Sequence, residues 1–113
     1  MFKVLNAKGM TADQIADLLY VWFLGMFSGN DTRNDFYCGI TNAPETRIRD
    51  HVSNDYNGKE INNIIVYECD SVDISFEVEK LMGNKGFDIG NPPHEGNGAA
   101  IDSCYIYLFK KPR

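Results

Sequence analysis

The residues with the clearest chemical potential lie between Phe36 and His51, in the stretch FYCGITNAPETRIRDH. Tyr37 falls in a strand-like segment, and Arg47 and His51 follow in a segment typical of a helix. Their spacing of four residues places both side chains on one helix face. A guanidinium matches phosphate oxygens with two parallel hydrogen bonds, and a phenol acts as a base where positive charge lowers its pKa. This cluster predicts a site suited to a phosphate.

The elements around this stretch must bring these side chains together. Phe36–Thr41 has the character of a short strand, and Asn42-Ala43-Pro44 starts a helix that runs to about Val52. Proline suits the first turn of a helix, where its missing N–H costs nothing. Thr41 and Asn42 therefore lie at the turn from strand to helix, close to the predicted site.

The remaining elements predict the fold class. Thr11 is a typical N-cap for a short helix from Ala12 to about Tyr20, and the aromatic and apolar run from Tyr20 to Phe27 favours a buried strand that forms a hairpin with residues 36–41. A strand at 63–69, a helix at 73–85, a Gly- and Pro-rich loop at 88–100 and a strand at 104–109 follow. The order α-β-β-α-β-α-β predicts an α+β domain, with helices flanking a small, mostly antiparallel sheet of three to four strands.

Length and charge narrow the class of protein. The 113 residues form a single domain, and their formal net charge is −5. An acidic chain has no long-range attraction for nucleic acid, although a local basic patch or a bound divalent cation reverses the sign within a site.

No apolar run is long enough to span a bilayer, so we expect no membrane partner. No signal-peptide pattern follows Met1, and three cysteines without CxxC spacing predict free thiols, so we expect a cytoplasmic protein.

The stretch from Tyr37 to His51 resembles the GIY-YIG nuclease superfamily. Tyr37-Cys-Gly39 stands where that family has Y-[IV]-G, and Ile40-Thr41-Asn42 is similar to its continuation. Arg47 lies ten residues after Tyr37 and His51 four later, as the family's arginine and frequent histidine do. The resemblance covers roughly residues 20–109, which makes residues 1–19 an N-terminal extension of a single domain at 1–113.

The resemblance implies a metal ligand on the third helix. The family places there a glutamate that binds a single Mg²⁺ or a similar cation such as Mn²⁺, and Glu77 and Glu79 are the two candidates. Ser75 and Met82 match the small and aliphatic residues that flank this glutamate in the family, which favours Glu79. A carboxylate is a suitable hard ligand for Mg²⁺.

The resemblance also implies an asparagine shortly after that helix. Asn91 has the family-like spacing, and Asn97 is the alternative. A basic tail that begins at Lys110 offers a further contact to a phosphate backbone. Together with Thr41, these are the predicted substrate-binding residues.

The sequence departs from the family at its first tyrosine, in the G-I-Y strand. Phe27 is the gapless counterpart, and Trp22 is the counterpart if the hairpin loop is longer. Neither side chain has a phenol. Tyr105 and Tyr107 alternate on the last strand, and we interpret them as core packing, with a base-stacking platform as the alternative.

The resemblance implies metal-dependent hydrolysis of DNA phosphodiester bonds. In that mechanism Tyr37 orients or deprotonates the attacking water, Arg47 neutralises charge in the transition state, and Glu79 holds the cation. His51 assists through a hydrogen bond to Tyr37 or to phosphate. The alternative is a binding module that keeps the fold without catalysis and recognises nucleic acid or protein. A homodimer or a protein partner could provide targeting.

Overall fold

The computed structural model describes residues 2–90 and 104–112. In chain order the elements are β1 (Val4–Asn6), α1 (Ala12–Met26), a 3₁₀ turn (Arg33–Asp35), β2 (Phe36–Thr41), α2 (Pro44–Asp55), β3 (Ile64–Glu68), α3 (Val72–Asn84) and β4 (Tyr105–Lys110). Over these ranges no helix has the length and apolar character needed to cross a membrane.

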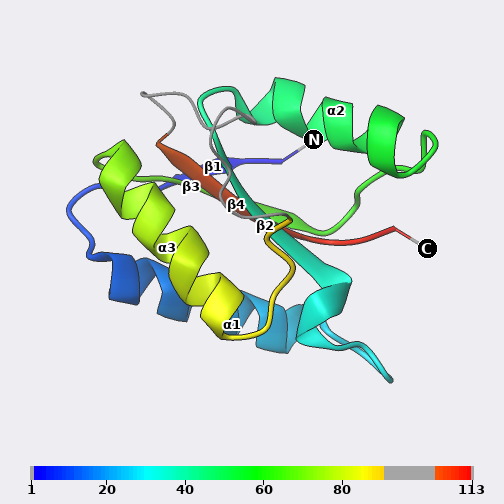
Figure 1. Ribbon diagram of the computed structural model, residues 1–113, viewed down its shortest axis with the longest axis horizontal. Helices are drawn as coiled ribbons and strands as arrows, with labels where there is room; N and C mark the ends of the chain where they lie inside the picture. Colours follow the sequence, from blue (N-terminus) through cyan, green and yellow to red (C-terminus); the bar gives the residue numbers. More distant parts are fainter. Residues whose placement is uncertain (1, 91–103, 113) are drawn as a thin grey trace.

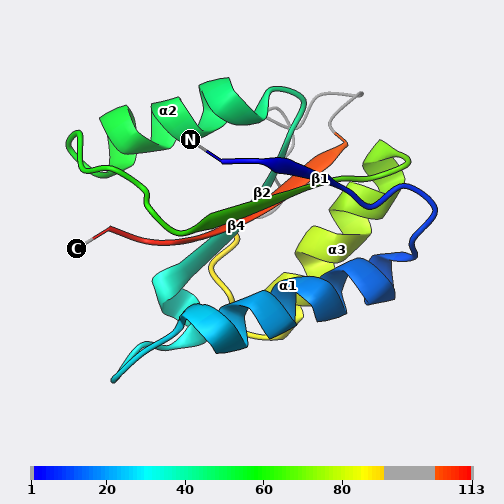
Figure 2. The same cartoon turned by 180° about the vertical axis from the view of Figure 1, so that it is seen from behind.

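The four strands form one sheet in the order β1-β3-β4-β2. The β3–β4 and β4–β2 pairs are antiparallel, whereas β1 pairs with β3 in parallel. Helix α2 covers one face of this sheet, and α1 and α3 cover the other (Figures 1 and 2). The predicted α+β class is confirmed, with a sheet that is mixed and mostly antiparallel.

One predicted strand is wrong, because the run from Tyr20 to Phe27 continues the first helix. Thr11 caps α1 as predicted, through a reciprocal capping box with Gln14. The buried side chains of α1 lie at positions i, i+1, i+4 and i+8, which share one face of a helix: Ile15, Ala16, Leu19 and Phe23. The other face of α1 exposes further apolar side chains: Leu18, Val21, Leu24 and Met26. A helix that is apolar on both faces cannot be told from a buried strand by composition alone.

The predicted hairpin between residues 20–27 and 36–41 therefore does not form. The antiparallel partner of β2 is β4, in a register that pairs Tyr37 with Phe109 and Gly39 with Tyr107. β4 lies between β2 and β3, although it comes last in the chain. The strand beside the Tyr-Cys-Gly segment thus follows it in the sequence instead of preceding it.

The N-terminal residues belong to the same packed unit. β1 forms one edge of the sheet, with Val4 in register with Val66 of β3. A boundary between an extension and a core at residues 19 and 20 falls inside α1. Helix α1 also packs along α3 beneath the sheet (Figure 2).

The other predicted elements agree with the structure to within a few residues. β2 spans Phe36–Thr41, and Pro44 lies in the first turn of α2, which runs on to Asp55. β3, α3 and β4 lie within one residue of their predicted starts and ends. Ser71 caps α3 by accepting a hydrogen bond from the Ile74 amide.

Alternation along β2 and β4 divides the core into two layers. The layer that faces α1 and α3 contains Phe36, Cys38, Ile40, Ile106 and Leu108. The second layer, which faces α2, contains Tyr37, Tyr107 and Phe109, and these rings pack with Ile48 of α2. The second layer is rich in phenols, and it carries the candidate site.

Candidate functional site

The aromatic rings of β2 and β4 form a continuous stack under α2. The ring centroids of Tyr37 and Phe109 lie 5.5 Å apart, those of Tyr37 and Tyr107 6.2 Å, and those of Tyr107 and Phe109 6.0 Å. Gly39 makes room for this stack, because a Cβ atom there would lie 2.6 Å from Cζ of Tyr107 and would also overlap its hydroxyl. The glycine of the Tyr-Cys-Gly segment is thus required by the ring that lies opposite it.

Tyr107 packs in the core, as the sequence predicts, and its hydroxyl also joins the candidate site. Only 1% of it is exposed, and its hydroxyl lies 2.7 Å from Nε2 of His51. The sequence signal for it was the alternation of Tyr105 and Tyr107 on an otherwise apolar strand, because a buried phenol needs a polar partner. What the sequence could not show was that β4 lies beside β2.

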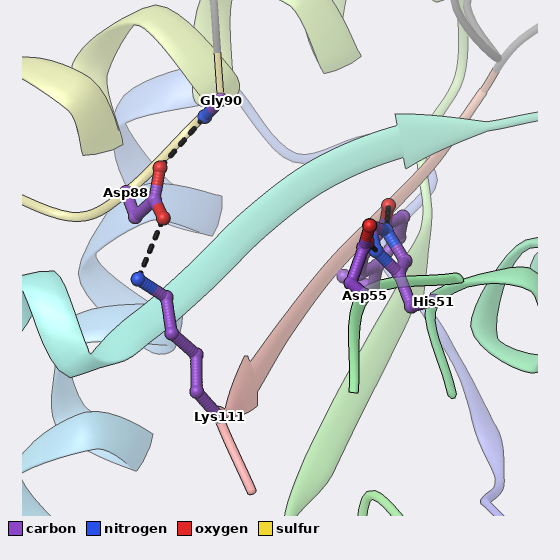
Figure 3. A network of polar contacts seen from close by, with 6 residues as sticks. His51, Asp55, Asp88, Gly90 and Lys111 are labelled. Atoms are coloured by element: carbon purple, nitrogen blue, oxygen red, sulfur yellow. Dashed lines mark hydrogen bonds and ion pairs between the residues drawn. The ribbon is translucent and has the colours of Figure 1, made fainter. Parts of the chain in front are cut away.

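His51 is buried, and both of its ring nitrogens have partners. Nδ1 lies 2.7 Å from Oδ2 of Asp55 (Figure 3), and Nε2 lies 2.7 Å from the Tyr107 hydroxyl. In the structure Nε2 of His51 therefore bonds Tyr107 and not Tyr37, which meets the imidazole ring edge to face at 4.8 Å. Burial lowers the pKa of His51, and the charge of Arg47 lowers it further, against an opposing effect of Asp55. His51 is neutral at pH 7.

Arg47 joins the two phenols. Its guanidinium is partly exposed and hydrogen-bonds both Tyr37 and Tyr107. Burial raises the pKa of both phenols more than the charge of Arg47 lowers it. Both phenols are therefore protonated at neutral pH, and Arg47 remains a cation that faces the surface from a polar cluster.

Glu79 approaches β2 from the other face of the sheet. It is 5% exposed on α3, and burial raises its pKa to about 7. Its charge contributes to raising the pKa of Tyr37 and of Cys38, so the carboxylate lies near the edge strand that carries Tyr37. Glu77 on the same helix is exposed. This placement supports Glu79 over Glu77.

The donor set near Glu79 suits a cation that keeps most of its water. In residues 2–90 and 104–112 no group of three or more His, Cys, Asp or Glu side chains could hold a metal. Mg²⁺ commonly binds proteins through one or two carboxylates and retains several waters, so a single glutamate fits this ion better than it fits Zn²⁺ or Ca²⁺. A divalent cation would also favour the ionised form of a carboxylate that burial otherwise disfavours.

Of the four predicted substrate-binding residues, Thr41 and Lys110 lie in the described part of the chain. Asn91 and Asn97 lie outside the described residues. Thr41 is 2% exposed, and its Oγ1 accepts a hydrogen bond from the Ala43 amide at 3.0 Å. In the structure Thr41 shapes the turn from β2 to α2 and so holds the helix that carries Arg47.

The basic tail is tied down by two ion pairs. Lys110 lies 2.7 Å from the carboxylate of Asp31, whose side chain is 1% exposed. Lys111 lies 2.6 Å from the carboxylate of Asp88 (Figure 3). Asp88 in turn pairs through its backbone with β2, where it accepts from the Cys38 amide at 2.8 Å. Both lysines thus fasten the end of β4 to neighbouring loops.

The two residues aligned with the family's first tyrosine lie outside this cluster. Trp22 is in α1 and packs edge to face on Phe36, and Phe27 follows α1 and stacks on Phe23. Both belong to the layer on the opposite side of the sheet from Tyr37. The phenol beside Tyr37 is supplied by Tyr107 instead.

Comparison with known proteins agrees with this arrangement. The family model described as the GIY-YIG catalytic domain matches residues 20–85, a span that contains β2, α2 and α3 and ends before β4. No curated protein and no solved structure matches the chain. The family match covers more than half of the sequence and includes Tyr37, Arg47, His51 and Glu79. The chain therefore belongs to the GIY-YIG family.

Proposed function

We propose that this protein is a metal-dependent endonuclease that hydrolyses DNA phosphodiester bonds. Membership of the GIY-YIG family implies nuclease-type activity in general. The observation that carries the specific proposal is the convergence of Tyr37, Arg47, His51 and Tyr107 under α2, with one guanidinium hydrogen-bonded to both phenols. The positive charge of Arg47, held between two neutral hydroxyl groups at a partly exposed position, is suited to bind a phosphodiester.

Arg47 is the group that we expect to contact the phosphate. Its two phenol partners leave other N–H donors of the five-donor guanidinium for phosphate oxygens. Because these partners are fixed by the ring stack, the guanidinium is oriented before substrate arrives. Preorganised positive charge of this kind stabilises the charge that develops in the transition state.

Tyr37 is the phenol that we expect to orient the attacking water. It is partly exposed, whereas Tyr107 is buried. Because burial holds its pKa above the ordinary value, Tyr37 acts through a neutral hydroxyl that is anchored by Arg47. Tyr107 supplies the second phenol of the site and acts through Arg47 and His51.

Glu79 is the residue that would hold Mg²⁺ or Mn²⁺. When bound, such an ion polarises a phosphoryl oxygen and stabilises the leaving oxygen. A local cation, together with Arg47, would also offset the net charge of −5 where DNA binds. The free thiols of Cys38, Cys69 and Cys104 suit a reducing compartment, so we place this activity in the cytoplasm.

Cleavage of supercoiled plasmid and of branched DNA tests this proposal. We expect nicking that requires Mg²⁺ or Mn²⁺, stops with a chelator, and is lost in Arg47→Ala and Glu79→Ala. Arg49→Ala is the matched control, because Arg49 is an exposed arginine on the same helix. If folded wild-type protein cuts none of these substrates, the alternative of a binding module for nucleic acid or protein replaces the nuclease.

A further inference from the structure

We propose that Asp55 is a positioning residue that sets the direction of a hydrogen-bond chain running from Arg47 through Tyr107 and His51. This inference deepens the nuclease function proposed above and rests on it. Asp55 matches none of the residues that the family resemblance implies, and it is the last residue of α2.

The two ends of the chain fix its direction. A guanidinium has only hydrogen-bond donors, and an ionised carboxylate has only acceptors. Nδ1 of His51 must therefore carry the proton that faces Oδ2 of Asp55 at 2.7 Å. A neutral imidazole then has a lone pair on Nε2, which accepts the hydroxyl proton of Tyr107 at 2.7 Å. The oxygen of Tyr107 is left to accept from Arg47.

The opposite tautomer would break this order. With the proton on Nε2, His51 would donate to the Tyr107 oxygen, and the hydroxyl proton of Tyr107 would have to turn toward the donors of Arg47. The guanidinium would then lose one of its two phenol acceptors. Asp55 thus acts on Arg47 from the far end of the chain, by selecting the tautomer of a buried histidine.

The position of Asp55 favours a role beyond stability. A carboxylate at the C-terminus of a helix is unfavourable because the helix macrodipole places negative charge there. The last turn of α2 holds no basic residue that would offset it. The side chain of Asp55 is 53% exposed, so its carboxylate contributes little to the core.

Three variants test this inference. Asp55→Ala removes the acceptor, and Asp55→Asn replaces it with an amide that can also donate to Nδ1. Asp50→Asn is the matched control, because Asp50 is on the same helix and acts on His51 only through its charge. Loss of one hydrogen bond and relief at the helix end oppose each other, so we expect all three to unfold within about 1 kcal/mol of wild type.

The decisive readout is the tautomer of His51, measured from imidazole nitrogen shifts by NMR. We expect the Nδ1–H tautomer in wild type and in Asp50→Asn, and a mixture or the Nε2–H tautomer in Asp55→Asn and Asp55→Ala. Wild-type tautomer in the Asp55 variants would overturn the inference. This readout needs no DNA. It therefore tests the hydrogen-bond chain independently of the proposed nuclease activity.

The second readout is the pH profile of single-turnover cleavage. The charged and titratable groups that act on His51 come from α2, β2 and β4: Arg47, Asp50, Asp55, Tyr37 and Tyr107. Asp55 raises the pKa of His51, so its loss should move the acidic limb to lower pH while the plateau rate falls tenfold or more. Asp50→Asn should move the limb in the same direction without lowering the plateau. An unchanged plateau in both Asp55 variants would contradict a positioning role.

Discussion

Tyr107 lies directly opposite Gly39 in the β2–β4 pair, and its ring fills the space that a side chain at position 39 would need. The two residues are far apart in the sequence, and one belongs to the matched family segment while the other lies beyond it. Their contact brings the C-terminal strand into the site. β4 thus places a second phenol beside Tyr37 from the other end of the domain.

The fit between Gly39 and Tyr107 leads to the first prediction. Gly39→Ala forces Tyr107 out of a buried stack, so we expect a loss of about 2 kcal/mol in the free energy of unfolding. Urea unfolding measures this loss. Gly25→Ala is the control, because Gly25 lies in α1 with open space where a Cβ would stand, and alanine there should add up to about 1 kcal/mol. Equal effects of the two substitutions would contradict the packing described here.

The raised pKa of Glu79 predicts a stability that depends on pH. Because the pKa is about 7 when folded and near its ordinary value of 4.5 when unfolded, folding favours the protonated form. The stability of wild type should fall as pH rises from about 4.5 to 7 and then level off. Glu79→Gln should therefore be more stable than wild type at pH 8 by roughly 3 kcal/mol, and equal to it near pH 4.5.

Urea unfolding at several pH values measures this difference, with the exposed Glu77→Gln as the control. Glu79→Gln should at the same time lose metal-dependent cleavage and any stabilisation by added Mg²⁺. A gain in stability together with a loss of activity would mark Glu79 as a residue kept for function. Parallel pH curves for wild type and Glu79→Gln would show that folding does not shift the pKa of Glu79.

Removal of the Lys110 side chain should lower the free energy of unfolding, because its ion pair would be lost. Lys110→Met leaves the nearly inaccessible Asp31 carboxylate without this cation, and we expect a loss of about 3 kcal/mol. Lys111→Met removes a pair with the more exposed Asp88 and should cost less than about 1 kcal/mol. Thermal unfolding of both variants measures this contrast. If Lys110→Met weakens DNA binding without loss of stability, Lys110 is a substrate contact as the sequence suggested.

The two phenol contacts of Arg47 predict that lysine cannot replace it. A lysine ammonium keeps the charge but lacks the planar fork that reaches two hydroxyl groups and a phosphate together. We expect Arg47→Lys to slow single-turnover cleavage by about a hundredfold. Arg49→Lys should cut at the wild-type rate. Full activity of Arg47→Lys would mean that only the charge at position 47 matters.

Local signals in the sequence predicted most of the elements. Thr11 and Pro44 mark the starts of α1 and α2, and short runs of apolar and aromatic residues mark β2 and β4. The composition of α1 was misleading, because a helix with Val21 and Leu24 exposed on its outer face has the aromatic and branched content of a strand. The partner of β2 could not be predicted, because pairing between distant segments leaves no local pattern.

The residues of the candidate site also differ in whether a local sequence pattern could predict them. Tyr37, Arg47 and His51 were found because they lie within one strand and the following helix, at spacings that short-range geometry controls. The contact of Tyr107 with His51 joins distant segments of the chain, and only the sheet order brings them together. Asp55 lies four residues after His51 on the same helix, so the spacing could have indicated its contact. The buried position of Glu79 relative to Glu77 likewise follows from how α3 packs on the sheet.

The most direct test of this account compares Tyr107→Phe with Tyr105→Phe in single-turnover cleavage of plasmid DNA with Mg²⁺. Tyr107→Phe removes only the hydroxyl that Arg47 and His51 share, so we predict a rate roughly tenfold to a hundredfold below wild type. Tyr105→Phe, on the same strand, should cut as wild type does. If folded Tyr107→Phe cuts at the wild-type rate, the C-terminal strand does not complete the active site.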